Sequence, residues 1–226
     1  MGTYLNPGNS GFEDICRGRY VDKTGMIALI NDAIGTSDKL TCVSRPRRFG
    51  KSFAAQMLCA YYDKTCDSSG LFDDKAIAKS KSYREHLNKY DVIYLNMTDV
   101  LGETNAEDLV AFIKRNIVRE LKESYPSLSA VEAFSATLVN AVEVAGNKFI
   151  MIIDEWDAPI RENPEIQREY LEFLRTLFKS SATTSKTFAA AYMTGILPIK
   201  KDGSQSAISD FEEYSVLEPG EFAGFV

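Results

Sequence analysis

A short segment near residue 50 combines the residue types that bind a phosphate chain. It reads KLTCVSRPRRFGKS from Lys39 to Ser52, and its apolar run at Leu40–Val43 predicts a short buried strand. A basic loop follows, and Gly50-Lys51-Ser52 leads into FAAQMLCAYY, the predicted first turns of a buried helix. The unpaired N–H groups and partial positive charge of a helix N-terminus favour a bound phosphate. Strand, loop, Gly-Lys-Ser and helix in this order indicate the phosphate-binding loop of a nucleoside triphosphatase.

The residues of this loop have individual predicted roles. Lys51 is expected to reach the β- and γ-phosphates, and the Ser52 hydroxyl to ligate Mg²⁺. The general pattern GxxxxGK[ST] has its first glycine where this chain has Arg45, and Pro46 favours an extended backbone there, so we expect the strand to continue through Arg45. The alternative is a basic loop that only caps a buried helix. The predicted nucleotide-binding residues of the loop are Arg45, Pro46, Arg47, Arg48, Phe49, Gly50, Lys51, Ser52 and Phe53.

An acidic motif further along the chain supports the nucleotide site. The segment KFIMIIDEWD begins at Lys148, and its apolar run Phe149–Ile153 predicts a strand buried on both faces of a parallel sheet. This is a Walker B pattern, in which Asp154 holds Mg²⁺ through water and Glu155 orients or deprotonates the attacking water. A strand that ends in a solvated acidic turn is the alternative. With the upstream motif, the pattern predicts ATP and Mg²⁺ as cofactors, Lys51 and Glu155 as catalytic residues, and Ser52 and Asp154 as metal ligands.

Other polar groups have two interpretations each. The predicted strand Thr187–Thr194 ends in a polar residue before Gly195, so Thr194 either senses the γ-phosphate or belongs to a simple glycine turn. Lys200 and Lys201 lie either in a solvated turn or facing a phosphate. The segment Asp22–Thr24 is expected to begin a helix with Thr24 as its cap, and it is also a candidate for contacts near the adenine.

Length and composition limit the classes of protein to which the chain can belong. At 226 residues, with 45% hydrophobic and 26% charged residues, the chain is long enough for one sizeable α/β domain. The net charge of −6 provides no overall basic surface, so a nucleic-acid partner is not indicated. No apolar run approaches the length of a membrane span, and the N-terminus lacks the apolar core of a signal peptide, so we expect a cytoplasmic protein. None of the four cysteines lies in a CxxC pair, which disfavours zinc.

Alternating strands and helices are expected to position these residues. We expect an α/β fold in one domain, with residues 1–18 as an extended surface arm and 19–226 as a core in which helices flank a parallel sheet. A long insertion after the first helix and an extra helix before the acidic motif favour a topology with an additional strand between the two motif strands. The remaining predicted elements are helices at Gly25–Ile34, Ala106–Tyr125, Leu128–Ala145 and Glu165–Ser180, strands at Asp91–Met97 and Glu213–Leu217, a turn at Thr98–Glu103 and a bridging segment at Pro159–Asn163.

The motifs in this order resemble the bacterial AAA-ATPase-like family. The resemblance is carried by YVDKTGMI, VSRPRRFGKSFAAQMLCAYY, FIMIIDEWDAPIRE, YLEFLRTLFK and AYMTGILPIKK, and it covers nearly the whole chain. It implies a P-loop ATPase core of the additional-strand class, in which Arg45 is itself a family feature. The matching positions are Lys51 and Ser52 in Walker A, Asp154 and Glu155 in Walker B, and Thr194 at the sensor position.

The resemblance also implies a neighbouring domain. Family members usually continue into a helical segment and a C-terminal domain similar to PD-(D/E)xK nucleases. No nuclease motif occurs before Val226, so a fragment and a natural short form both remain open. A C-terminal partner domain or a second copy of the chain is therefore an expected partner beside ATP, since the sequence shows no convincing arginine finger.

We expect an ATP-binding domain that hydrolyses ATP with Mg²⁺. The alternative is a nucleotide-gated switch that holds ATP without useful turnover. A scaffold with an inactive site is disfavoured by the intact set of Lys51, Ser52, Asp154 and Glu155.

Overall fold

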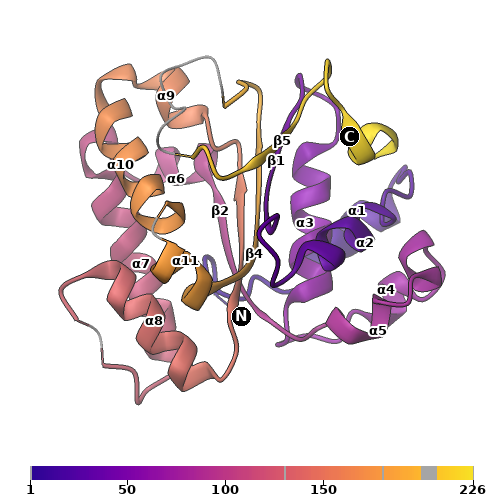
Figure 1. Cartoon of the computed structure of the whole chain (residues 1–226), viewed down its shortest axis with the longest axis horizontal. Helices are drawn as coiled ribbons and strands as arrows, with labels where there is room; N and C mark the ends of the chain where they lie inside the picture. The colour runs from indigo at the N-terminus through magenta and orange to yellow at the C-terminus, as the bar shows by residue number, and fades with distance from the viewer. Residues whose placement is uncertain (1, 130, 180, 200–207, 226) are drawn as a thin grey trace.

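A five-stranded parallel β-sheet runs through the middle of the molecule (Figure 1). The structure is a computed structural model that describes residues 2–129, 131–179, 181–199 and 208–225. The strand order is β2-β3-β4-β1-β5. The strands are β1 (Leu40–Ser44), β2 (Asp91–Asn96), β3 (Phe149–Asp154), β4 (Phe188–Gly195) and β5 (Glu212–Tyr214).

The strand order confirms the predicted α/β fold with an additional strand. β4 lies between β1, which leads into the basic loop, and β3, which ends in the acidic motif. Ser44 on β1 is opposite Gly195 on β4, and Ile153 on β3 is opposite Met193. Because the strands are parallel, their carboxyl ends meet at one edge of the sheet, where ligands bind in open α/β folds.

Helices cover both faces of the sheet. Helices α1 to α5 lie on one side of the sheet in Figure 1, and α7, α8, α10 and α11 lie on the other. None of the helices in the described ranges is long and apolar enough to cross a membrane. Their bounds are α1 (Ser10–Arg17), α2 (Met26–Ala33), α3 (Lys51–Tyr62), α4 (Ser69–Phe72), α5 (Tyr83–His86), α6 (Met97–Glu103), α7 (Leu109–Ser124), α8 (Phe134–Ala145), α9 (Ala158–Glu162), α10 (Gln167–Phe178) and α11 (Ser181–Thr187). Short 3₁₀ turns span Ala76–Lys79, Ala106–Asp108, Pro164–Ile166 and Gly220–Gly224.

Two hydrophobic cores, one on each face, hold the sheet between these helices. Successive residues of β3 alternate between them: Phe149 and Met151 belong to one core, and Ile150 and Ile152 to the other. This alternation follows from the period of two in a strand. All six β3 residues are buried, which explains why the strand reads as a continuous apolar run.

The N-terminal residues differ from the predicted extended surface arm. Residues 10–17 form helix α1, and the fully buried ring of Phe12 stacks on Phe72 with ring centroids 5.1 Å apart. Leu5 forms an antiparallel bridge with Ile93 at the β2 edge. The buried Glu120 carboxylate on α7 accepts backbone N–H groups from Thr3, Tyr4 and Leu5 at 3.1, 2.8 and 2.8 Å. The Glu120 contacts join residues more than a hundred positions apart in the sequence, so local composition does not reveal them.

Replacing Glu120 with alanine is expected to lower the free energy of unfolding by at least about 2 kcal/mol, because backbone donors near the N-terminus lose their acceptor. Urea unfolding followed by circular dichroism measures the change. Glu123→Ala, on the exposed face of the same helix, is the matched control and is expected to stay within about 0.5 kcal/mol of the parent. Equal stability of the two variants would show that other contacts hold the N-terminal segment.

Three other predicted elements were wrong. The expected turn at Thr98–Glu103 is helix α6, whose N-cap Asn96 accepts the N–H groups of Thr98 and Asp99 with its side chain. The expected bridge at Pro159–Asn163 is helix α9, which has proline in its first turn. The helix expected from Leu128 begins only at Phe134.

Candidate functional site

The predicted phosphate-binding loop lies between β1 and α3. The Arg45 N–H donates to the Gly195 carbonyl at 3.0 Å, so the ladder extends one residue beyond Ser44, as Pro46 predicts. Gly50 has φ of +78°, a left-handed conformation that suits glycine, and α3 begins at the next residue. The unpaired N–H groups of the first α3 turn therefore lie at the carboxyl edge of the sheet.

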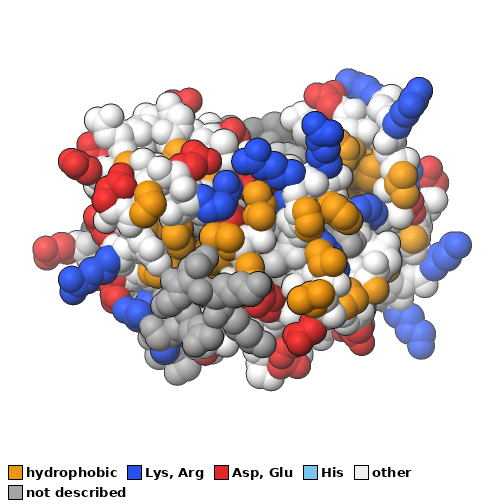
Figure 2. Space-filling view, turned by 90° about the horizontal axis from the view of Figure 1, so that it is seen from above, with side chains coloured by type: hydrophobic (Ala, Val, Ile, Leu, Met, Phe, Trp, Pro, Cys, Tyr) orange, Lys and Arg blue, Asp and Glu red, His pale blue; other side chains and the backbone are white. Residues whose placement is uncertain are grey.

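A cleft of about 520 Å³ opens at this edge, in front of α3. Figure 2 looks down on this face and shows Lys and Arg side chains gathered near its middle, with hydrophobic side chains beside them. The loop, α6, α9 and the turn after β3 all contribute to the walls. The lining residues are Arg47, Arg48, Gly50, Lys51, Ser52, Phe53, Asn96, Thr98, Asp99, Glu155, Arg161 and Glu162.

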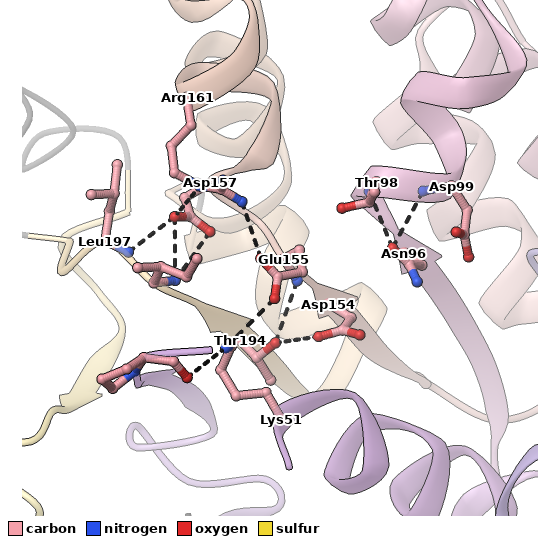
Figure 3. A network of polar contacts seen from close by, with 12 residues as sticks. Lys51, Asn96, Thr98, Asp99, Asp154, Glu155, Asp157, Arg161, Thr194 and Leu197 are labelled. Carbon is pink, nitrogen blue, oxygen red and sulfur yellow. Dashed lines mark hydrogen bonds and ion pairs between the residues drawn. The ribbon is translucent and has the colours of Figure 1, made fainter. Parts of the chain in front are cut away.

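The Glu155 carboxylate lies between two cations in this cleft (Figure 3). Lys51 Nζ is 3.5 Å from Glu155 Oε1, and Arg161 Nη2 is 3.1 Å from Oε2. Lys51 Nζ also donates to the Pro46 carbonyl at 3.2 Å, and its side chain is only 4% exposed. Glu155 has φ of +53°, a left-handed conformation that is uncommon for residues other than glycine. The structure thus brings the two predicted catalytic residues into contact.

Asp154, the residue before Glu155, is fully buried. The Thr194 hydroxyl donates to Asp154 Oδ1, and the Glu155 N–H donates to Thr194 Oγ1 at 3.3 Å, so Thr194 connects the two acids. Burial and the nearby Asp154 carboxylate raise the pKa of Tyr192, which leaves its phenol neutral. Asp154 Oδ2 is buried without a hydrogen-bond partner among the described residues. An unpaired carboxylate oxygen is costly in a protein interior, and water bound to a cation would satisfy it.

This donor set fits Mg²⁺. Magnesium is usually held by one or two protein oxygens together with phosphates and water, not by a cage of side chains. Ser52 is an exposed residue at the start of α3 with a hydroxyl that can ligate a cation. Asp154 provides Oδ2, the carboxylate oxygen without a hydrogen-bond partner among the described residues. The described part of the chain has no group of three His, Cys, Asp or Glu side chains that would form a cage.

A further ion pair borders the cleft, and the sequence analysis did not anticipate it. Arg161 Nε donates to the buried Asp157 at 2.8 Å. Asp157 also accepts the N–H groups of Ile196 and Leu197, at 3.2 and 3.0 Å, just after β4. Asp157 and Arg161 are four residues apart, a spacing that places side chains on one helical face. This signal was available in the sequence but required Pro159–Asn163 to be recognised as a helix.

The remaining predicted residues lie around the cleft rather than in it. The buried Arg45 and the exposed Pro46 border a separate, mainly apolar cleft of about 430 Å³ beside Ile196 and Pro198. Phe49 borders a third pocket, of about 300 Å³, on the other side of Gly50. Lys200 and Lys201 lie outside the described residues.

The segment Asp22–Thr24 does not cap α2. The Asp22 carboxylate accepts the Ala76 N–H at 2.8 Å, and the Thr24 hydroxyl accepts the Ile77 N–H at 3.2 Å. The α2 N-cap is Gly25, without a side-chain cap bond. Lys23 borders the third pocket and donates to the Phe49 carbonyl at 3.2 Å, so this segment supports the predicted phosphate-binding loop.

Comparison with known proteins identifies the family. The family model AAA-ATPase_like, described as "Predicted AAA-ATPase", matches residues 8–204. The chain belongs to this AAA-ATPase-like family. The motif-based resemblance is thereby confirmed, and the P-loop ATPase fold is shown.

The proteins similar to this AAA-ATPase-like chain include a curated protein and a solved structure. An uncharacterised protein from the vnfD 5′ region of Azotobacter chroococcum mcd 1 is 24% identical over 205 residues, which is 87% of this chain and 37% of that protein. The Aeropyrum pernix ORC2 protein, solved as ADPNP–ADP complexes, matches with a TM-score of 0.51 and 12% sequence identity. The match covers 85% of this chain and 46% of the ORC2 chain. At this identity the structural likeness shows the fold alone. The chain spans less than half the length of either protein.

Proposed function

We propose that this chain binds ATP in the 520 Å³ cleft and hydrolyses it with Mg²⁺. The observation that carries the proposal is the contact of Lys51, at the start of α3, with Glu155, which adjoins the buried Asp154 and its unpaired oxygen. The start of α3, a lysine and a carboxylate line one cleft, and the adjacent Asp154 is buried behind its lining with an unpaired oxygen. Phosphoryl transfer uses these same groups to bind phosphates, a metal ion and the attacking water. The family membership supports nucleotide binding.

The proposed roles follow from these positions. Lys51 and the N–H groups of the first α3 turn bind the β- and γ-phosphates. Ser52 and Asp154 would hold Mg²⁺, which supplies neutralising charge to the phosphates. The oxygen of water attacks the γ-phosphorus while the bond from this phosphorus to the β,γ-bridging oxygen breaks, and ADP leaves with that electron pair. Glu155 takes the proton of the attacking water, and Thr194 keeps the Asp154 carboxylate in place.

The pocket beside Gly50 is the proposed site of the nucleotide base. Tyr20, Val21, Phe49, Phe53 and Met57 give it an apolar wall. Phe53 is half exposed and borders both this pocket and the phosphate cleft. A nucleotide whose phosphates lie at α3 can therefore reach it with its base. The Aeropyrum pernix ORC2 protein was solved in complexes with ADPNP and ADP, both adenine nucleotides, which supports an adenine here.

Phe53→Ala is expected to weaken ATP binding about fivefold, or about 1 kcal/mol, because a base loses its stacking partner. Its affinity for inorganic tripolyphosphate, which has no base, is expected to stay unchanged. Competition against a fluorescent ATP analogue measures both affinities in one assay. An equal loss for the two ligands would show that Phe53 shapes the phosphate cleft instead.

Direct measurement on the unmodified chain tests the proposed function. Calorimetry with ATP, with and without Mg²⁺, reports binding, and phosphate release reports hydrolysis. Binding that strengthens with Mg²⁺ and is followed by phosphate release is the expected result. Absence of ATP binding at millimolar concentration would overturn the proposal.

The alternative is a nucleotide-gated switch without useful turnover. The ion pairs of Glu155 with Lys51 and Arg161 favour it, because a carboxylate held by two cations is not free to activate water. ATP binding without phosphate release would support this alternative. A cytoplasmic location, and a partner domain or second copy, stay predictions from the sequence.

A further inference from the structure

We infer that Arg161 supplies, from within the same chain, the cation that stabilises the γ-phosphoryl group during transfer. The inference rests on the proposed ATPase function and adds a residue that the sequence motifs do not contain. It depends on how Arg161 is anchored, on what it contacts and on where it lies relative to Lys51.

The anchor of Arg161 is a buried carboxylate. Asp157 is fully buried and receives the Arg161 Nε–H together with the backbone N–H groups of Ile196 and Leu197. These bonds join the start of α9 to the end of β4, one of the strands next to the phosphate loop. The Nε end of the guanidinium is therefore fixed, while Nη2 contacts Glu155 in the cleft.

The position of Arg161 relative to Lys51 is set by Glu155. Lys51 approaches one oxygen of this carboxylate and Arg161 approaches the other (Figure 3). An anion bound by Lys51 beside Glu155 therefore lies within reach of Arg161 after rotation about side-chain bonds alone.

The chemistry of the guanidinium suits this role. It presents five N–H donors in a planar fork, so one edge can stay on Asp157 while the other binds phosphate oxygens. The Arg161 side chain is 19% exposed, and a charge in such a partly buried site is less screened than a surface charge. Arg47 and Arg48 also border the cleft, but they lie on the exposed loop.

An exchange of partners links Arg161 to the proposed base. When the γ-phosphoryl oxygens accept hydrogen bonds from Arg161 and Lys51, these two side chains leave Glu155. Its carboxylate is then free to accept the proton of water, while the oxygen of that water bonds to phosphorus and ADP leaves with the electrons of the broken P–O bond. The contact of Arg161 with the phosphoryl oxygens thus stabilises the transferred group and also frees the Glu155 carboxylate to act as the base.

Trapping of a transition-state analogue tests the inference. Mg²⁺, ADP and aluminium fluoride are added to the parent chain, and the release of labelled ADP is timed. The parent is expected to release ADP at least about tenfold more slowly with aluminium fluoride than without. Arg161→Ala is expected to bind ADP within about threefold of the parent, to lose this slowing, and to hydrolyse ATP in a single turnover about 10³-fold more slowly.

Two further variants control the experiment. Arg168→Ala removes an exposed arginine of α10 that does not border the cleft, and it is expected to behave as the parent. Arg161→Lys keeps a positive charge for the buried Asp157 and protects the fold, but its single ammonium lacks the fork that spans Asp157 and a phosphate. Arg161→Lys is expected to bind ADP with the affinity of the parent, but aluminium fluoride is expected to slow its ADP release much less.

The outcomes separate this inference from the proposed function. If Arg161→Ala and Arg161→Lys both trap ADP and hydrolyse ATP like the parent, Arg161 has no such role and the ATPase assignment stands. If the parent binds ADP but gains nothing from aluminium fluoride, the cation does not come from this chain, and the inference is wrong. If the parent binds neither ADP nor ATP, the proposed function fails and the inference fails with it.

Discussion

Lys51→Ala is expected to abolish measurable ATP binding while the fold persists. The Lys51 ammonium is almost completely buried at the start of α3, so its attraction to phosphate oxygens is only weakly screened by water. Removing one partner of such a charge-assisted contact costs about 2–5 kcal/mol. This corresponds to a loss of affinity of roughly 30- to 5,000-fold.

The fold is expected to survive because Glu155 does not lose its only counter-ion. Arg161 still pairs with Glu155 in the Lys51→Ala variant, so no buried charge is left alone. Calorimetry with Mg²⁺-ATP measures the affinity, and circular dichroism checks the fold. Lys122→Ala, at an exposed position of α7, is the matched control. ATP affinity unchanged by Lys51→Ala would remove the phosphate-binding role of this loop.

Local sequence patterns predict the strands of this fold and the two acids at the end of β3. β1, β3 and β4 are buried at every position, so each appears in the sequence as an apolar run with a clear end. Their parallel pairing then brings Ser44, Asp154 and Gly195 to one edge of the sheet. The order of the elements predicted that an additional strand lies between the two motif strands, and the structure shows that this strand is β4.

Contacts between distant segments explain what the sequence did not reveal. Helix α6 contains Thr98 and Gly102, which disfavour helix locally, but burial of Met97 and Val100 and the Asn96 cap stabilise it. Asp157 lacks an obvious role until the N–H groups that follow β4 are seen to meet it. Local propensity describes neither kind of contact.

The same limit applies to Arg45. Its position in the motif suggested that its charge contacts phosphate, whereas the structure buries its side chain at the border of a different cleft. A side chain's direction after a strand depends on the alternation of that strand and on what packs beside it. Gly195 shows how tight this packing is, because a Cβ atom there would lie 2.6 Å from Trp156 Nε1.

Glu155→Gln is expected to retain Mg²⁺-ATP binding and to lose turnover. Glutamine has nearly the same shape and still accepts a hydrogen bond from water, but it cannot take the proton. Loss of a general base typically lowers the rate by about 10²–10⁴-fold. The substitution also removes the carboxylate that competes with phosphate for Lys51 and Arg161, so ATP is expected to bind at least as tightly as in the parent.

Asp154→Asn provides the contrast within the same site. It keeps a hydrogen-bond partner for Thr194 but weakens the oxygen proposed to hold Mg²⁺, so the Mg²⁺ concentration needed for half-maximal binding or turnover is expected to rise. Glu162→Gln, at an exposed position of the same cleft, controls for the loss of one negative charge. Single-turnover hydrolysis across Mg²⁺ concentrations distinguishes the three variants.

The comparison also decides between the enzyme and the switch. Hydrolysis by Glu155→Gln within about threefold of the parent would show that Glu155 is not the base, and that its unusual backbone conformation serves the turn before Trp156. A parent that binds Mg²⁺-ATP but releases no phosphate would instead favour the switch. Glu155→Gln would then still be informative, because a switch gated by the ion pairs of Glu155 should bind ATP more tightly when they are removed.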